Sequence, residues 1–263
     1  MRYARVYLEG WMTTSLLASL VVFACTFGGA MTGMLLSRRL PPHHLSPESK
    51  DVVKLGMGLV ATMTALVLGL LVSAAKSSYD SQNNEMTELA AKVVILDRTL
   101  KHYGPDAEPI RKTLRGVVEV AIERIFPKDG SHEDQISAPQ AGADAVLEQI
   151  QALQPEDDAQ HTYKSLAVNM TVGLGQERWL MYTQGTTAVS KPMLYIVVFW
   201  LTMSFISFGV YAPPNGTVTA ALFMSAFAVS SAIFLILEMY APYGGLIHIS
   251  SAPVRAALAH MGQ

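Results

Sequence analysis

Four long apolar runs constrain the fold of this chain more than any other feature of its sequence. They cover about residues 11–37, 52–75, 193–212 and 218–241. A hydrocarbon core of about 30 Å requires roughly 20 predominantly apolar residues in a helix, and only helices and closed barrels satisfy their backbone hydrogen bonds in lipid. The runs therefore predict four transmembrane helices, and the expected fold class is an all-α polytopic membrane protein.

Composition supports this class, and the placement of charge divides the chain. The sequence is 51% hydrophobic and 15% charged, with a mean hydropathy of +0.30. Residues 76–191 hold 17 of the 21 acidic residues and 12 of the 19 Lys and Arg residues. Polar and apolar sequence is thus separated into blocks, which predicts a water-facing insert between the second and third spans.

The insert has the periodicity of helices. Apolar residues recur every three or four positions over 86–103, and this run stops at Gly104 and Pro105, as helices commonly do. Similar patterns predict further helices over 106–125, from a capping box at Ser137 to about 153, and from about 156 toward 179. The expected organisation is two spans in 11–75, a helical domain in 76–191, two spans in 193–241 and a tail in 242–263.

Topology follows from counting the spans. Four crossings place both termini and the insert on one side of the membrane. Basic residues flank both sides, with a small excess on the side of the insert, which favours a cytoplasmic insert and cytoplasmic termini.

Small residues recur on the first two spans. Gly29 and Gly33 form a GxxxG pair, which lets a neighbouring helix approach closely. On the second span, small residues recur every four positions and form a second stripe expected to serve helix packing: Ala61, Ala65, Gly69 and Ser73.

The opposite face of the second span is bulky and apolar, and it consists of Leu59, Met63, Leu66 and Leu70. If several copies surround an axis, these side chains form a hydrophobic ring that gates a pore by dewetting. The alternative is that the small stripe packs within one subunit while the bulky face meets lipid. The sequence leaves both interpretations open.

Five charged residues are candidates for a pore mouth or for structural pairing. Lys76 and Asp80 follow the second span, where a lysine can simply snorkel to the interface. Asp97 and Arg98 lie among apolar helix positions, where an ion pair with another helix is expected. Glu238 is an intramembrane carboxylate, which marks a functional candidate, although it could also cap or pair at the interface.

No pattern nominates catalytic, metal or cofactor chemistry. The sequence lacks G-x-S-x-G, HExxH and phosphate-binding glycine motifs, and His43 and His44 do not have the spacing of a shared metal face. The single cysteine, Cys25, lies in an apolar run, and no basic cluster predicts nucleic-acid binding. We therefore expect no enzyme, no cofactor and no metal site.

Three stretches together carry a family resemblance. They are "GLVATMTALVLGLLVSAAKSSYDSQ", "LDRTLKHYG" and "SFGVYAPPNGTVTAALFMSAFAVSSAIFLILEMYAPYGGLIHISSAPVRAAL". In this order they resemble the bestrophin-like family of bacterial membrane proteins, over about residues 50–260. Residues 128–160 match least.

The resemblance implies an architecture and a location. Bestrophins, to which that family is remotely similar, are pentameric ion channels with four spans, cytoplasmic termini, a helical cytosolic insert and a pore lined by the second helix. The resemblance thus implies a homo-oligomer, by analogy a pentamer, in the bacterial inner membrane, with the bilayer and inorganic ions as partners. The bestrophin pore constriction is not recognisable in "ATMTALVLGLL", so no individual pore residue is carried over.

Two functions are compatible with these patterns. The first is an ion channel whose second spans surround a hydrophobically gated pore. The alternative is a membrane-anchored interaction or sensory module without a pore, whose insert docks a cytosolic partner through a heptad-like face such as that of 86–103.

Overall fold

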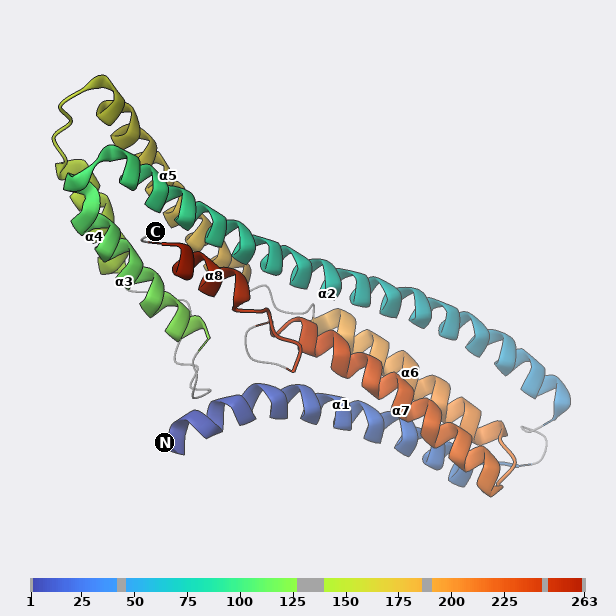
Figure 1. Ribbon diagram of the computed structural model, residues 1–263. Coiled ribbons are helices and arrows are strands. Elements are labelled where there is room, and N and C mark those ends of the chain that lie inside the picture. Colours follow the sequence, from blue (N-terminus) through green and yellow to red (C-terminus); the bar gives the residue numbers. More distant parts are fainter. Residues whose placement is uncertain (1, 42–45, 127–139, 186–190, 243–245, 262–263) are drawn as a thin grey trace.

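The computed structural model describes residues 2–41, 46–126, 140–185, 191–242 and 246–261, and this part of the chain is helical without strands. Figure 1 shows an elongated molecule in which one long helix, α2 (Pro47–Tyr103), extends from the apolar bundle into the helical domain. The α-helices, in chain order, are α1 (Arg2–Ser37), α2 (Pro47–Tyr103), α3 (Glu108–Ile125), α4 (Gln140–Ala152), α5 (Asp158–Gly185), α6 (Lys191–Tyr211), α7 (Gly216–Met239) and α8 (Ala252–His260).

Four of these helices, α1, α2, α6 and α7, are long and apolar enough to cross a bilayer. The apolar segments are Thr14–Ser37 in α1, Pro192–Tyr211 in α6, Gly216–Met239 in α7 and part of α2. They coincide with the four apolar runs of the sequence, so the all-α class and the four long apolar helices are confirmed.

The helix α2 joins the two parts of the molecule. Its 57 residues form one uninterrupted helix, which spans roughly 85 Å at 1.5 Å per residue. It begins at the N-cap Ser46, whose hydroxyl accepts a hydrogen bond from the Ser49 N–H, and Pro47 occupies the first turn. It ends before Gly104, whose φ of +126° favours glycine. The apolar half of α2 therefore continues directly into its polar half.

The apolar helices form a bundle with α2 on its outer side. α1 packs along α6 and α7, and α2 packs against α6 and α7 from another side (Figure 1). The core between α2, α6 and α7 contains Leu71, Ala75, Val197, Leu201 and Ile233. This arrangement leaves most of α2 outside the bundle.

Glycines allow α1 and α6 to approach closely. A Cβ atom on Gly33 would overlap the carbonyl oxygen of Ile206, and one on Gly209 would overlap that of Ala30. A Cβ atom on Gly29 would lie 3.3 Å from the carbonyl oxygen of Thr202. The GxxxG pair thus faces the backbone of α6, with a glycine of α6 opposite.

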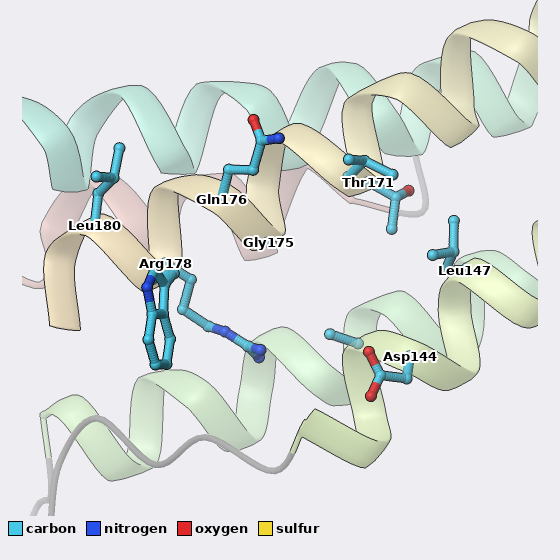
Figure 2. A pocket seen from close by; sticks show the side chains of 10 residues that line it. Asp144, Leu147, Thr171, Gly175, Gln176, Arg178 and Leu180 are labelled. Carbon is cyan, nitrogen blue, oxygen red and sulfur yellow. The ribbon is translucent and has the colours of Figure 1, made fainter. Parts of the chain in front are cut away.

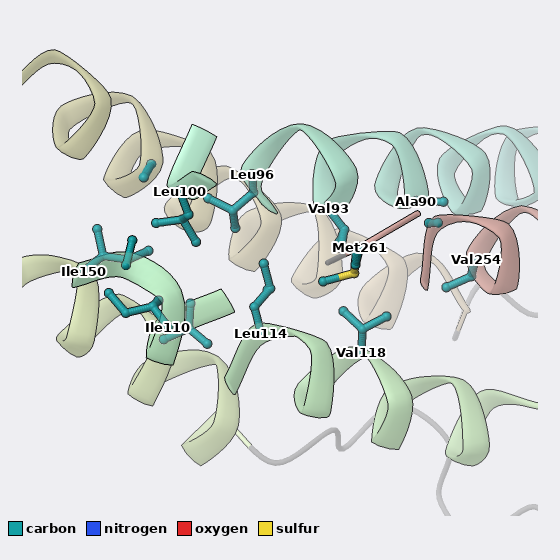
Figure 3. Close-up of a cluster of buried hydrophobic side chains, with 14 of the residues drawn as sticks. Ala90, Val93, Leu96, Leu100, Ile110, Leu114, Val118, Ile150, Val254 and Met261 are labelled. Carbon is teal, nitrogen blue, oxygen red and sulfur yellow. The ribbon is translucent and has the colours of Figure 1, made fainter. Parts of the chain in front are cut away.

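The second core lies in the helical domain, which consists of the polar half of α2 with α3, α4, α5 and α8. Figure 3 shows Leu114 and Val118 pointing from α3 toward Leu96 and Val93 of α2. The tail expected over 242–263 contains α8, and buried side chains of this region, including Val254, Ala257 and Met261, belong to the same core.

The helices of the insert follow their predicted positions with small differences. A short 3₁₀ turn at Pro105–Ala107 precedes α3, so the second helix of the insert begins at Glu108 rather than at 106. α4 begins at Gln140, and the expected capping residue Ser137 lies outside the described residues.

The close crossing of α1 and α6 predicts a sharp difference between two glycines. Gly33→Ala forces the two backbones apart and should lower the free energy of unfolding by about 1–3 kcal/mol. Gly28→Ala adds its methyl group to open space five residues away and should be neutral or slightly stabilising. Thermal unfolding of the purified protein in detergent measures both, and equal midpoints for the two variants would contradict the packing.

Candidate functional site

The apolar half of α2 has one face that packs within the chain. Thr64, Leu71 and Ala75 are buried, and Val67 and Leu68 are partly buried against the core shared with α6 and α7. This face lies between the two stripes recognised in the sequence. Neither stripe therefore provides the main contact of α2 with its own bundle.

The bulky stripe of α2 is uncovered in the single chain. The exposed fractions are 63% for Leu59, 49% for Met63, 67% for Leu66 and 57% for Leu70. All four are apolar side chains on the outer side of α2, so they must meet lipid, a second copy of the chain, or an axial space between copies.

The small stripe of α2 is also exposed. Ala61, Ala65, Gly69 and Ser73 are all exposed, and a Cβ atom on Gly69 would meet no atom within 4 Å. Within the single chain this stripe makes no close packing contact, and the inner face of α2 meets the bundle instead. A role of the stripe in helix packing stays a prediction. The stripe is a flat surface that the single chain leaves uncovered.

Lys76 and Asp80 mark the transition from the apolar half of α2 to its polar half. They form an ion pair one turn apart on the surface of the helix, and both side chains are about half exposed. Nearby, the Tyr79 hydroxyl donates to the backbone oxygen of His248, 3.3 Å away, which ties this point of α2 to the segment before α8. The local charges at the transition thus compensate each other.

A buried ion pair connects α2 to α3. The Arg111 guanidinium donates to both carboxylate oxygens of Asp97, with N–O distances of 2.9 and 3.0 Å, and to Glu108 at 2.9 Å. The side chains of Asp97 and Arg111 are nearly inaccessible to solvent. The expected interhelical pair of Asp97 is therefore present, whereas Arg98 is exposed and makes no ion pair within the described parts of the chain.

The geometry explains the charge state of Arg111. Its hydrogen bonds to the Asp97 carboxylate raise its pKa, while burial acts in the opposite direction. A group whose folded-state pKa is raised contributes its stabilisation below the unfolded value, so the contribution is fully present at neutral pH. This bidentate pair fixes the angle at which α3 leaves α2.

A second ion-pair cluster connects α2 to α5. Lys92 contacts Glu177 on α5 and, 2.8 Å away, Glu88 on its own helix. The hydrogen bond to Glu177 is the main cause of a raised Lys92 pKa. All three groups are partly exposed, so this cluster aligns the helices more than it stabilises them.

Glu238 is fully buried at the end of α7, among the apolar helices. The Ser15 hydroxyl of α1 donates to one carboxylate oxygen at 2.8 Å, and the Leu246 N–H donates to the other. Glu238 thus joins α1, α7 and the segment leading to α8. Its contacts are those of a structural connection between the bundle and the helical domain.

Clusters of potential metal ligands were the first candidates for a site. Among the described residues, no group of three His, Cys, Asp or Glu side chains could hold a metal ion. His43 and His44 lie outside the described residues. The features left for function are the uncovered faces of α2 and the cavities of the helical domain.

The hydrogen-bond partners of Asp97 and Glu238 were not identified from the sequence. Arg111 lies 14 residues from Asp97 and on another helix, and Ser15 lies 223 residues from Glu238. The regular apolar spacing of residues 110–125 predicts a buried helix face and does not by itself indicate a role for Arg111. An arginine on such a face does indicate a buried ion pair, because arginine is rarely buried without a partner.

Comparison with protein families gives a match over most of the chain. The family model described as "Bestrophin-like domain" matches residues 24–254. No curated protein and no solved structure matches the chain.

The ion pair of α2 with α3 predicts unequal effects for adjacent charges. Asp97→Ala leaves the buried Arg111 without its main partner and should lower the free energy of unfolding by about 3–5 kcal/mol. Arg98→Ala changes an exposed residue and should stay within about 0.5 kcal/mol. Denaturant unfolding monitored by circular dichroism tests the contrast, and a small effect of Asp97→Ala would show that the pair does not hold α3.

Proposed function

The chain belongs to the bestrophin-like family, and we propose that it is an oligomeric ion channel with α2 lining a hydrophobically gated pore. The family relationship supports channel activity as a class. The assignment of the pore to α2 and the pentameric assembly are proposals for this chain. We further propose that it lies in the bacterial inner membrane with its termini and helical domain in the cytoplasm.

The main support for this proposal is that the rest of the chain covers little of the apolar half of α2. In its most apolar segment, only 11% of the residues are buried, compared with 22–28% in the other three spans. A helix at the outer side of its own bundle is the one best placed to meet copies of itself around an axis. α2 also contains both a flat small stripe and a bulky stripe, and both are exposed.

The two stripes suit two different surroundings. Close contact between helices in a membrane is favoured by small residues, so Ala61, Ala65, Gly69 and Ser73 suit an interface with the neighbouring subunit. Leu59, Met63, Leu66 and Leu70 would then surround the axis. A narrow ring of such side chains excludes water and closes the pore until it widens.

The charge of the helical domain favours cations near one entrance. Residues 76–191 contain five more acidic than basic side chains. Around a symmetric axis this excess would be multiplied by the number of subunits and would attract cations into a vestibule. Strong selectivity for anions is therefore not expected.

The alternative function, a membrane-anchored interaction module, is favoured by apolar side chains exposed on the helical domain. Ile95 of α2 and Leu166 of α5 are about half exposed outside the membrane spans. A partner could dock on them. In this case the protein needs no axial pore, and affinity purification from the source membrane should recover a soluble partner in stoichiometric amount, lost in an Ile95→Glu variant.

The channel proposal predicts that one exposed leucine of α2 controls conduction. Leu66→Ser should raise ion flux several-fold in proteoliposomes, because a polar side chain wets the hydrophobic ring. Leu20→Ser changes a similarly exposed leucine of α1 and should leave the flux unchanged. Flux measured with an ion-sensitive dye after reconstitution at matched protein density tests this prediction.

Two results would contradict the pore assignment. One is a flux that is the same in the parent protein, Leu66→Ser and Leu20→Ser. The other is an equal increase in both variants, which would indicate a general disturbance of the bundle.

A further inference from the structure

The helical domain contains an apolar cavity, here called the inner cavity, of about 550 Å³. It lies among α2, α3, α4, α5 and α8. Its volume falls within the range of roughly 300–1,000 Å³ that ligand sites occupy. The cavity is independent of the proposed pore, because its α2 residues begin at Met86, in the polar half of that helix.

Charge is distributed unevenly around the inner cavity. Its described lining is almost entirely aliphatic, and the only charged members of that lining are Arg124 of α3 and Arg178 of α5. No acidic side chain belongs to it. An apolar space with cationic side chains and no acid in its lining is complementary to a molecule with an apolar body and an anionic head.

Arg178 lies where the inner cavity meets a second, more open cavity of about 620 Å³, here called the outer cavity. Both cavities are lined by Ala143, Thr171, Gly175 and Arg178. Figure 2 shows the Arg178 side chain reaching from α5 toward α4, which carries Asp144 on the outer cavity. No ion pair of Arg178 is present among the residues that the structure describes. Within the described parts of the chain, no partner therefore occupies the donors of this guanidinium at the mouth of the inner cavity.

The position of the inner cavity suggests how an apolar ligand would reach it. Met86 follows Lys76, where α2 turns polar, by ten residues, or roughly 15 Å along the helix. Trp179 and Leu180, which are exposed, line the outer cavity beside Arg178. An amphiphile leaving the adjacent bilayer would meet these exposed apolar side chains first.

We propose that the inner cavity binds a long-chain fatty acid, with its carboxylate on Arg178 and its acyl chain among α2, α3 and α5. The carboxylate matches the planar guanidinium, which binds such groups in a bidentate manner. Arg124 adds a second positive charge to the same lining.

The size of the inner cavity matches one long acyl chain. A methylene group occupies roughly the 30 Å³ of a water molecule in the liquid, so sixteen carbons need roughly 480 Å³. This volume is close to the 550 Å³ of the inner cavity. The outer cavity adjoins it, so competition by phosphatidylglycerol tests whether a second chain is accommodated. A single-chain carboxylate thus fills the inner cavity with its chain and places its anionic head on Arg178.

Glycine at position 175 offers a direct way to fill the site. Gly175 lines both cavities, and a Cβ atom there would meet nothing within 4 Å. Gly175→Leu would place a side chain in the space of the ligand, and it also replaces a poor helix former by a good one. The matched control is Ser165→Leu, which adds the same side chain to an exposed position of α5 outside both cavities.

The test uses the full-length protein in lipid nanodiscs and palmitate that carries a photoreactive diazirine on its chain. Mass spectrometry measures the label on residues of α3 and α5 that line the inner cavity, relative to the label on α7, which meets lipid. We expect saturable labelling of the cavity, competed by palmitate and much less by hexadecanol or phosphatidylglycerol. Arg178→Gln should weaken it at least about tenfold, because a charge-assisted bond is lost.

Controls separate binding from folding. Arg98→Gln removes an exposed arginine outside the cavities, and it should label like the parent protein, as should Ser165→Leu. Gly175→Leu should abolish the cavity label while its thermal midpoint stays the same or rises. If Gly175→Leu fails to fold, Arg178→Gln alone decides, because no hydrogen bond or ion pair within the described chain is lost with that side chain.

Three outcomes would overturn the proposal: label confined to the membrane spans, equal competition by hexadecanol together with no effect of Arg178→Gln, or equal competition by phosphatidylglycerol. The readout requires no ion conduction. Failure of the channel proposal would therefore leave this test unaffected, and failure here would leave the channel proposal unaffected.

Discussion

In α2, 57 consecutive residues share one ladder of backbone hydrogen bonds, so the apolar half and the polar half of this helix cannot move independently. A break near Lys76 would leave carbonyl and N–H groups without partners close to the hydrocarbon, where they cost several kcal/mol each. The helix therefore continues, and both parts of the molecule are built along it. The bundle packs on Leu71 and Ala75, and the helical domain packs on Val93 and Leu96.

Connections on either side of α2 keep the two parts in register. Asp97 and Arg111 fix α3, and the Lys92 cluster aligns α5. Glu238 ties the end of α7 to α1 and to the segment before α8. These polar contacts are specific in direction, while the surrounding apolar contacts supply most of the burial. Together they leave the outer faces of α2 uncovered and the inner cavity open between α2, α3 and α5.

The sequence was most informative where one physical rule dominates. Length and hydropathy located four long apolar helices, because lipid allows few alternatives to a continuous helix. The sequence was less informative about which face of α2 packs against the bundle. Both stripes of α2 were recognised, but Thr64, Leu71 and Ala75 form the contact with the bundle, and they lie between the stripes. Selecting among three faces requires the positions of α6 and α7.

Long-range partners were likewise hidden from the sequence. Asp97 was expected to pair with another helix, yet only the turn at Gly104 brings Arg111 beside it. The inner cavity depends on side chains from five helices, and no spacing along the chain indicates that Arg178 lies at its mouth. The sequence analysis did not predict the α8 helix, because its nine residues are too few to show a clear helical periodicity.

Electron microscopy of the purified protein in lipid nanodiscs, with class averages and a mass determination of the same sample, shows directly whether α2 surrounds an axis. We expect a ring of four or more copies, and by family analogy five, with α2 innermost and Leu66 facing the axis. A monomer, a two-fold dimer, or a ring with α2 on its lipid-facing perimeter would contradict it.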